Sequence, residues 1–352
     1  MDILVKCGTA GLPLRDLDFI CADLAQNVEH FRSKEILIYG GTGFIGKWLV
    51  AGLLHSNEQL GMDARLTVVT RDVRGAQRQI NVPKGEKVKF IQHDLVLSAP
   101  IEEITADFVF HAATPTMKVT GSNNPKAVVA STVNAANHAA NLSSRNNDKP
   151  MVIHLSSGAV YGPQPMDMEL RLETDKDIYN SESSYTRAKL AAENILFSAY
   201  TAGKILYQSP RLFAFAGPFI PLDAHFAVGN FVKDGLSERA IKLTGSPLTR
   251  RSYLYPVDLV NILLRTTKIN LYENFNIGSD QSVSMFELGE LVSHLTSKKG
   301  VSLDPNNSVP TNYVPDISFV RDTMQYPNIL DLDSGLERWI AWLSREEYAE
   351  NW

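Results

Sequence analysis

The sequence predicts an α/β fold: a parallel sheet covered by helices on both faces, with a smaller lobe toward the C-terminus. Three observations support this prediction. Short apolar runs alternate with longer segments of helical periodicity between about residues 35 and 215. A glycine-rich turn joins the first apolar run to the first helical segment. After residue 215 the alternation gives way to shorter segments with more proline and glycine.

The expected elements follow one another in a regular order. Strands are expected at 36–39, 66–70, 88–91, 108–110, 151–155 and 206–213, and helices at about 47–54, 127–142 and 184–199. Because such alternation requires crossovers between parallel strands, the sheet should be doubly wound with right-handed connections.

Residues 1–34 form a helical extension ahead of this pattern. Leu17, Ile20, Leu24, Val28 and Phe31 recur at spacings of three and four, which places them on one helical face. The pattern fits a helix packed on the main domain, and it also fits a dimer contact.

Composition excludes several classes of function. The 352 residues carry a net charge of −5 and no cluster of Lys and Arg, which argues against a nucleic-acid-binding surface. No run of about 18 apolar residues suggests a membrane span, and the N-terminus lacks the layout of a secretory signal. Cys7 and Cys21 are too few for a metal site or a disulfide framework, so we expect no metal and a cytoplasmic protein.

The glycine-rich turn has the spacing of a dinucleotide-binding loop. The pattern Gly-x-x-Gly-x-x-Gly lies between a predicted strand and a predicted helix, the context that a Rossmann-type sheet requires. Glycines allow the tight turn and the close approach of a pyrophosphate, whose charge then lies at a helix N-terminus. The residues expected to bind the cofactor here are Gly40, Thr42, Gly43, Phe44, Ile45 and Gly46.

The ends of the next strands indicate which cofactor is bound. Arg71 follows the second strand, where a basic residue accommodates the 2′-phosphate of NADP; this slightly favours NADP over NAD. Asp72 lies one or two positions too late to bind the ribose hydroxyls of NAD, and a solvated basic loop remains an alternative for Arg71. Asp94 and Leu95, after the third strand, could reach the adenine. Ala112, Ala113 and Thr114 follow the fourth strand, where small residues let the backbone pass the cofactor, whereas His111 is expected to be structural.

A serine, a tyrosine and a lysine form the predicted proton-transfer site. Tyr185 and Lys189 are four residues apart and so share a helix face. An adjacent ammonium should lower the pKa of the Tyr185 phenol toward the working pH, which would make it a general acid or base. Ser157, at the end of the fifth strand, could donate a hydrogen bond to the same substrate oxygen, and Lys189 could also hold the nicotinamide ribose. A second Tyr-x-x-x-Lys match, Tyr200 to Lys204, runs into a glycine and is interpreted as a helix end.

At these residues the chain resembles the extended short-chain dehydrogenase/reductases of the epimerase/dehydratase family, which act on nucleotide sugars. The resemblance runs from about residue 35 to 340 and includes the segments 156–162, 210–218, 251–258 and 275–278. It implies that Arg251 binds the substrate diphosphate, that Asn230 lies near the sugar nucleotide, and that the protein is a homodimer. The predicted division is then a dinucleotide-binding domain of 35–215 plus about 241–280, and a substrate-binding lobe of 216–240 and 281–352.

Departures from the family pattern narrow the expected activity. Sugar 4,6-dehydratases of this family carry an Asp-Glu pair where this chain has Gly158 and Ala159, which cannot perform acid-base elimination. Thr132 and Ala214 replace asparagines that the family often carries. The sequence therefore favours an epimerase or a reductase acting at the sugar C4. The alternatives are a 4,6-dehydratase-like enzyme, an NADPH carbonyl reductase for a non-sugar substrate, and a non-catalytic cofactor-sensing protein.

Overall fold

The computed structural model describes residues 7–82, 85, 87–97, 101, 104–114, 124–144, 148–176, 183–223, 226–269, 274–304, 308–326 and 329–345. The segment 164–184 is polar and lacks clear periodicity, so the sequence predicts that it lies over the substrate mouth; its residues 177–182 lie outside these ranges.

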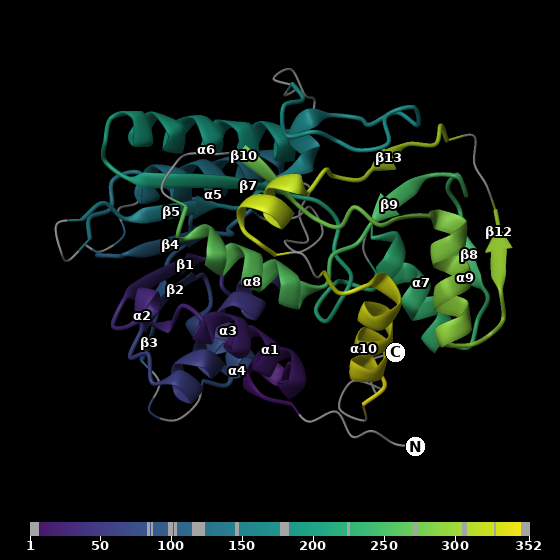
Figure 1. Cartoon of the computed structure of the whole chain (residues 1–352), viewed down its shortest axis with the longest axis horizontal. Helices are drawn as coiled ribbons and strands as arrows, with labels where there is room; N and C mark the ends of the chain where they lie inside the picture. Colours follow the sequence, from purple (N-terminus) through teal and green to yellow (C-terminus); the bar gives the residue numbers. More distant parts are fainter. Residues whose placement is uncertain are drawn as a thin grey trace.

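A parallel sheet forms the middle layer of the larger lobe, on the left in Figure 1. Its strand order is β10-β7-β5-β4-β1-β2-β3, and the short strand β6 also pairs with β7. Every neighbouring pair along this order is parallel, which confirms the predicted α/β fold of the Rossmann type. The bounds are β1 Glu35–Tyr39, β2 Arg65–Thr70, β3 Val88–Gln92, β4 Phe108–His111, β5 Met151–His154, β6 Ser156–Ser157, β7 Leu206–Leu212 and β10 Asn274–Ile277.

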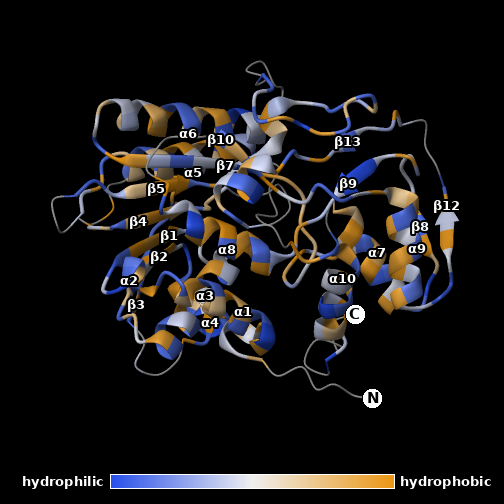
Figure 2. Cartoon of the chain, viewed as in Figure 1, coloured by the Kyte–Doolittle hydropathy of each residue, from blue (hydrophilic) through white to orange (hydrophobic). Residues whose placement is uncertain are grey.

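Helices cover both faces of this sheet. Ile38 and Phe110 point into a core shared with α3 (Phe44–Leu60) and α8 (Pro256–Thr266), and the α4 helix (Val73–Ile80) adds Ile80 to that core. Leu37 and Val109, one residue away in each strand, point instead toward α5 (Pro125–Ala139) and α6 (Ser184–Thr201). Strands buried on both faces should be apolar along their whole length, and Figure 2 shows β1 and β4 coloured mainly as hydrophobic.

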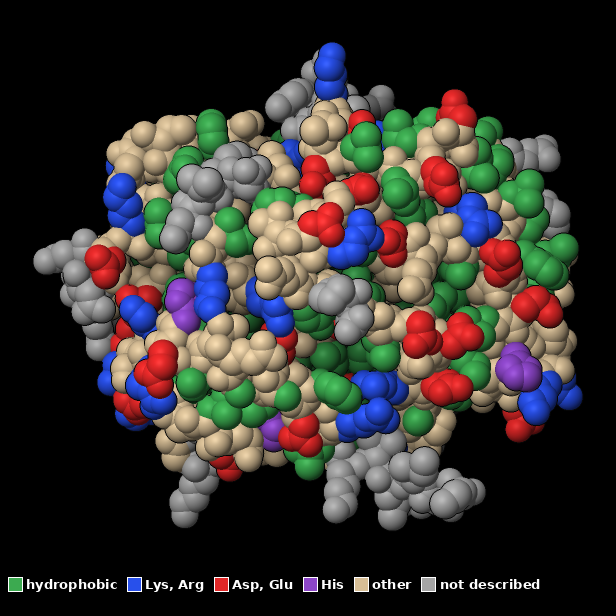
Figure 3. All heavy atoms as spheres, viewed as in Figure 1, with side chains coloured by type: hydrophobic (Ala, Val, Ile, Leu, Met, Phe, Trp, Pro, Cys, Tyr) green, Lys and Arg blue, Asp and Glu red, His purple; other side chains and the backbone are tan. Residues whose placement is uncertain are grey.

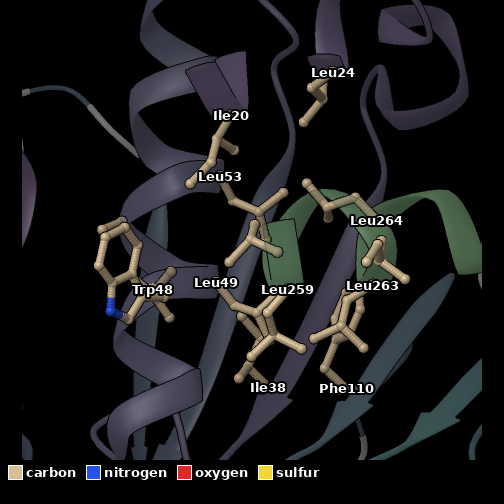
Figure 4. Close-up of a cluster of buried hydrophobic side chains, with 14 of the residues drawn as sticks. Ile20, Leu24, Ile38, Trp48, Leu49, Leu53, Phe110, Leu259, Leu263 and Leu264 are labelled. Atoms are coloured by element: carbon tan, nitrogen blue, oxygen red, sulfur yellow. The ribbon is translucent and has the colours of Figure 1, made fainter. Parts of the chain in front are cut away.

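The N-terminal extension packs on the helices of the first face. It comprises η1 (Thr9–Gly11), α1 (Leu14–Ala25) and α2 (Val28–Phe31). Leu17, Ile20 and Leu24 are at most 2% exposed, and Figure 4 shows Ile20 and Leu24 beside side chains of α3 and α8. Gly52 permits this approach, because a Cβ there would lie 2.9 Å from Ile20. The apolar stripe is therefore part of the core of the monomer, the first of the two interpretations above.

The C-terminal half supplies two small sheets and their own helices. One sheet has the order β11-β9-β13 (Ser282–Ser284, Arg250–Ser252, Asn312–Tyr313), and the other pairs β12 with β8 (Val301–Leu303, Ile241–Leu243). The helices α7 (Ala227–Leu236), α9 (Met285–Leu295) and α10 (Leu332–Leu343) share a separate apolar cluster centred on Phe231, Leu288 and Trp339. A π-helical segment, η3, spans Phe319–Thr323. Between residues 241 and 280, β8 and β9 belong to the small sheets and α8 and β10 to the main layer, so the exact domain boundaries stay a prediction.

On the face shown in Figure 3, acidic and basic side chains are interspersed among neutral ones. None of the helices in the described ranges combines the length and the apolar character needed to span a bilayer.

Candidate active site

The glycine turn forms a backbone cradle between β1 and α3. Gly40 has a φ of +79°, in the left-handed region that glycine tolerates, and a Cβ there would lie 2.9 Å from the backbone of Ala112. A Cβ on Gly46 would lie 2.1 Å from the carbonyl oxygen of Gly40. Only glycine fits either position, and the turn is closed by a hydrogen bond from the Gly43 N–H to the Gly40 carbonyl, 3.0 Å long.

The cradle opens at the N-terminus of a long helix. Gly43 is the N-cap of α3 and supplies no side-chain cap, so the first N–H groups of this 17-residue helix are not satisfied by a capping side chain. These donors and the helix dipole suit a pyrophosphate. Thr42, Phe44 and Ile45 are half-buried around the turn. The arrangement fits a dinucleotide, which would supply the hydride acceptor for oxidation of a substrate alcohol.

The strand ends beside the cradle have distinct local roles. Arg71 is exposed directly after β2. The Asp72 carboxylate caps α4 by accepting a hydrogen bond of 2.9 Å from the Gly75 N–H. Asp94 accepts one of 3.0 Å from the Val96 N–H, which forms the turn after β3, and the Leu95 carbonyl accepts from the Asn134 amide at 2.9 Å.

The segment after β4 lies against the glycine turn. Ala112 donates its N–H to the Tyr39 carbonyl at 3.0 Å, and Thr114 is hydrogen-bonded to Thr132 through their hydroxyls at 3.2 Å. Thr132, which stands where the family often has asparagine, is fully buried. It therefore connects α5 to this segment.

The predicted triad is brought together where β6 meets α6. Ser157 ends β6 and caps the 3-10 helix η2 (Gly158–Tyr161), accepting a hydrogen bond of 3.2 Å from the Ala159 N–H. Tyr185 and Lys189 lie in the first turns of α6, whose N-terminus is capped by Ser183. Ser157 lies near enough to Tyr185 to lower the pKa of its phenol, and the Lys189 ammonium lies 5.6 Å from the centre of the Tyr185 ring. The sequence spacing thus produced the expected constellation.

The charge states differ from the prediction at one point. Burial raises the pKa of Tyr185, and the nearby Ser157 hydroxyl only partly opposes this rise. The expectation of a lowered tyrosine pKa is therefore wrong for this structure. The physical reason is the burial of Tyr185 itself. Lys189 is buried as well, which lowers its own pKa to about 7, and its ammonium donates to the Leu155 carbonyl.

A buried ion pair supports the floor of this site. Glu193, one turn beyond Lys189, accepts hydrogen bonds from the Ser156 hydroxyl and from Arg211 of β7, the latter at 2.9 Å. Arg211 is 2% exposed. A buried charge is stable only when it is paired. The contacts among Glu193, Ser156 and Arg211 therefore hold α6 against β6 and β7.

Two buried histidines on adjacent strands lie near Lys189. His111 of β4 and His154 of β5 are paired in register and fully buried, with their Nδ1 atoms 2.7 Å apart. Burial lowers the pKa of both, that of His111 to about 3, so the pair is neutral. His111 is thus held within the sheet, in keeping with the structural role expected for it.

The structure adds a residue that the sequence did not indicate. The hydroxyl of Tyr313 of β13 donates, at 3.4 Å, to the carbonyl of Leu212, the residue paired with Ser157 across β6 and β7. No motif surrounds Tyr313, so its position depends on the pairing of β13 with β9.

The two predicted substrate residues differ in what surrounds them. Arg251 lies beside Tyr313 in register and donates to the Arg250 and Thr311 carbonyls at 2.8 and 3.0 Å. Asn230 is half-buried on α7. Their roles toward a substrate stay a prediction.

Comparison with known proteins identifies the family. The model of the NAD dependent epimerase/dehydratase family matches residues 36–278. The chain belongs to this family. It is therefore a member of an NAD-dependent enzyme family. Within the part of the chain that the structure describes, no group of acidic, His and Cys side chains could hold a metal ion.

Curated relatives include UDP-glucuronic acid decarboxylases. UDP-glucuronic acid decarboxylase 1 of Danio rerio is 26% identical over 89% of this chain and 73% of that protein. UDP-glucuronic acid decarboxylase 3 of Arabidopsis thaliana is 27% identical over 86% of this chain and 87% of that protein.

Solved structures share the fold. UDP-N-acetylglucosamine 4-epimerase from Methanobrevibacter ruminantium M1 superposes with a TM-score of 0.74 at 22% identity, covering 89% of this chain and 98% of that one. UDP-glucuronic acid 4-epimerase from Bacillus cereus, solved in complex with NAD, has a TM-score of 0.71 at 20% identity and covers 90% and 99%.

Proposed function

We propose that this protein oxidises and reduces the C4 position of a UDP-sugar with a bound nicotinamide dinucleotide. The observation that carries the proposal is the position of the Lys189 ammonium 5.6 Å from the Tyr185 ring, on the helix that follows Ser157 at the end of β6, in a chain with an intact dinucleotide cradle. Tyr185 takes the proton of the C4 hydroxyl when the sugar is oxidised and returns it when the ketone is reduced. Ser157 orients the same oxygen, and Lys189 stabilises the phenolate and holds the nicotinamide ribose.

The proposed substrate class, a UDP-sugar, is supported by the names of the relatives and by the position of Arg251. The named relatives and solved structures act on UDP-sugars, and Arg251 lies beside Tyr313, close to the proton-transfer residues. We propose that Arg251 binds the substrate diphosphate and that Asn230 of α7 lies beside the sugar. A homodimer is proposed by analogy with the family alone.

The structure gives a steric argument against a conventional 4,6-dehydratase. A Cβ on Gly158 would lie 2.6 Å from the ring of Phe213, so an acidic side chain does not fit there without rearrangement. Ala159 supplies no acid either. Return of the hydride to C4, by an epimerase or a reductase, needs neither residue.

Decarboxylation is a second candidate, favoured by the names of the curated relatives. Oxidation of UDP-glucuronic acid at C4 places a ketone β to the C6 carboxylate. The bond between C5 and C6 then breaks, carbon dioxide leaves, and the electron pair forms an enolate that is protonated at C5 before C4 is reduced. This route also needs no acid at positions 158 and 159, and it uses the same first step.

Product analysis separates these activities. The enzyme is incubated with NAD and UDP-glucuronic acid or UDP-glucose, and with NADPH and a 4-keto sugar nucleotide. A product of unchanged mass indicates an epimerase, a product lighter by carbon dioxide a decarboxylase, and net consumption of NADPH a reductase. Tyr185→Phe should lower turnover by about 10²–10⁴-fold while leaving cofactor affinity nearly unchanged. Full activity of this variant would contradict the assignment, and cofactor binding without turnover of any substrate would favour a sensing role.

The choice between NAD and NADP depends on Arg71. Its guanidinium is exposed after β2, and the neighbouring Asp72 carboxylate is engaged in capping α4. We therefore propose a modest preference for NADP(H). Calorimetric titration should show that Arg71→Glu weakens NADPH binding about tenfold or more and leaves NADH binding little changed. Equal losses for both cofactors would refute a role in recognising the 2′-phosphate.

A further inference from the structure

Two neighbouring arginines on β9 have different surroundings. β9 is the central strand of its sheet, and successive side chains of a strand point to opposite faces. The Arg250 guanidinium is paired with the Glu287 carboxylate of α9 at 3.5 Å and donates to the hydroxyl and carbonyl of Ser282 at 3.1 and 2.9 Å. The Arg251 guanidinium lies instead 5.8 Å from the ring centre of Tyr313. The charge of Arg250 is therefore neutralised within the small lobe, and that of Arg251 is not.

Arg251 carries a charge that the described residues leave unpaired. It is half-buried, burial lowers its pKa, and no ion pair joins it to any residue in the ranges given above. Burying part of a guanidinium without a carboxylate is unfavourable, and an anion bound beside it would compensate the charge. This imbalance supports the diphosphate site proposed for Arg251.

Thr311 holds this guanidinium by one edge. The Thr311 carbonyl accepts from Nη1 of Arg251 at 3.0 Å, and the Thr311 hydroxyl accepts from Nη2 at 3.3 Å. Nη1 also donates to the Arg250 carbonyl at 2.8 Å. These three bonds use the edge between Nη1 and Nη2 and keep the guanidinium beside the Tyr313 ring.

The other edge of the guanidinium stays free. A guanidinium has five N–H donors, and no described residue accepts from Nε of Arg251 or from the second hydrogen of Nη2. The N–H groups of Nε and Nη2 are parallel, and such a pair matches two oxygens of a phosphate. The bonds to Thr311 thus leave available the edge that can bind a phosphate with two hydrogen bonds.

We propose that Thr311 is a positioning residue that presents the free edge of Arg251 to the substrate diphosphate. The proposal rests on the proposed function, since it assumes that Arg251 binds the diphosphate of a UDP-sugar. Without the Thr311 hydroxyl, Nη2 loses its acceptor and the guanidinium gains freedom to turn. Part of the binding free energy is then lost in ordering the guanidinium when the diphosphate binds.

Calorimetric titration of the full chain with UDP tests the proposal. Thr311→Val keeps the shape of the side chain and removes the hydroxyl, so the Kd for UDP should rise about five- to tenfold, against about 100-fold for Arg251→Met. Thr311→Ser retains the hydroxyl and should keep the affinity within about twofold of the unaltered protein. Adding Thr311→Val to Arg251→Met should have no further effect.

Ser282→Ala is the matched control. It removes from Arg250 the same kind of hydroxyl acceptor that Thr311→Val removes from Arg251, and it should leave the Kd for UDP unchanged. With a UDP-sugar that the enzyme converts, Thr311→Val should raise KM and change kcat by less than about twofold, because the diphosphate is remote from C4. A merely structural role would instead lower kcat, through displacement of the neighbouring Tyr313.

An unchanged Kd in Thr311→Val, an equal loss in Ser282→Ala, a loss in Thr311→Ser as large as that in Thr311→Val, or a full additional loss in the Arg251→Met background would each overturn the proposal. No binding of UDP by the unaltered protein would overturn the proposed substrate class as well. UDP binding that follows the expected pattern, without turnover of any UDP-sugar, would refute the proposed reaction and leave the role of Thr311 standing.

Discussion

At the scale of single residues, the site depends on a buried amine. Lys189 is 4% exposed, and burial lowers its pKa to about 7 from the ordinary 10.5. In the unfolded chain the amine stays charged up to about pH 10. Burying Lys189 therefore lowers the free energy of unfolding. This loss is complete below pH 7 and disappears as the pH rises toward 10.5, because between these values Lys189 is protonated in the unfolded chain and neutral in the folded one.

Replacing this amine should stabilise the protein while inactivating it. Lys189→Met keeps the length of the side chain and removes the buried charge, so urea unfolding at pH 6 should show a gain of a few kcal/mol, on the order of the pKa shift. At pH 10 the gain should nearly vanish. Lys204→Met, at an exposed lysine with no such burial, should show no pH-dependent gain. A gain of equal size at both pH values would contradict the burial argument.

Sequence spacing could predict the triad but not its charge states. The four-residue interval between Tyr185 and Lys189 fixes a common helix face, and the strand end fixes Ser157. The pKa of Tyr185 depends on how deeply α6 is buried, which no local pattern reports. Tyr313 was missed for a related reason: its hydroxyl reaches the Leu212 carbonyl beside Ser157 only because the short strand β13 pairs with β9.

At the scale of elements, the turn between β1 and α3 is the most constrained part of the cofactor site. A methyl group on Gly46 would meet the Gly40 carbonyl, and this clash lies directly under the N–H groups that would bind a pyrophosphate. The loop could then relax only by moving those donors.

Gly46→Ala should therefore abolish cofactor binding. We expect a loss of about 100-fold or more in the affinity for NAD and NADPH, measured by fluorescence titration. Gly245→Ala is the control, since a Cβ there meets nothing within 4 Å. Normal cofactor binding by Gly46→Ala would show that the cradle is not the pyrophosphate site.

The main sheet could be predicted and the small sheets could not. Strands such as β1 and β4 are buried on both faces, so their apolar runs are visible in the sequence. The strands β8, β9, β11 and β12 have three residues each, too few to show a period. The helical extension was visible as a stripe, but its packing on α3 and α8 was one of two open interpretations.

At the scale of the whole molecule, distant segments converge around α8. Asp16 of α1 is 1% exposed and accepts hydrogen bonds from Tyr255, at 2.6 Å, and from Arg338 of α10, at 2.8 Å. Asp23 of α1 is paired with Arg265 of α8. Through these contacts the N-terminal extension joins the helix layer of the main sheet to the C-terminal helices. The proton-transfer site likewise draws Ser157 from the main sheet and Tyr313 from a small one.

The central claim is reversible hydride transfer at the sugar C4, and isotope transfer tests it most directly. UDP-glucose and UDP-glucuronic acid carrying deuterium at C4 are mixed with the enzyme and its cofactor, the reaction is stopped within one turnover, and the released nicotinamide is analysed by mass spectrometry. The account predicts deuterium in the reduced cofactor with at least one of these sugars, and none with Tyr185→Phe. Because the deuterium returns to C4 when the ketone is reduced, the cofactor is sampled before product is released. Absence of deuterium from the cofactor at every time within one turnover of a sugar that the enzyme converts would contradict the account.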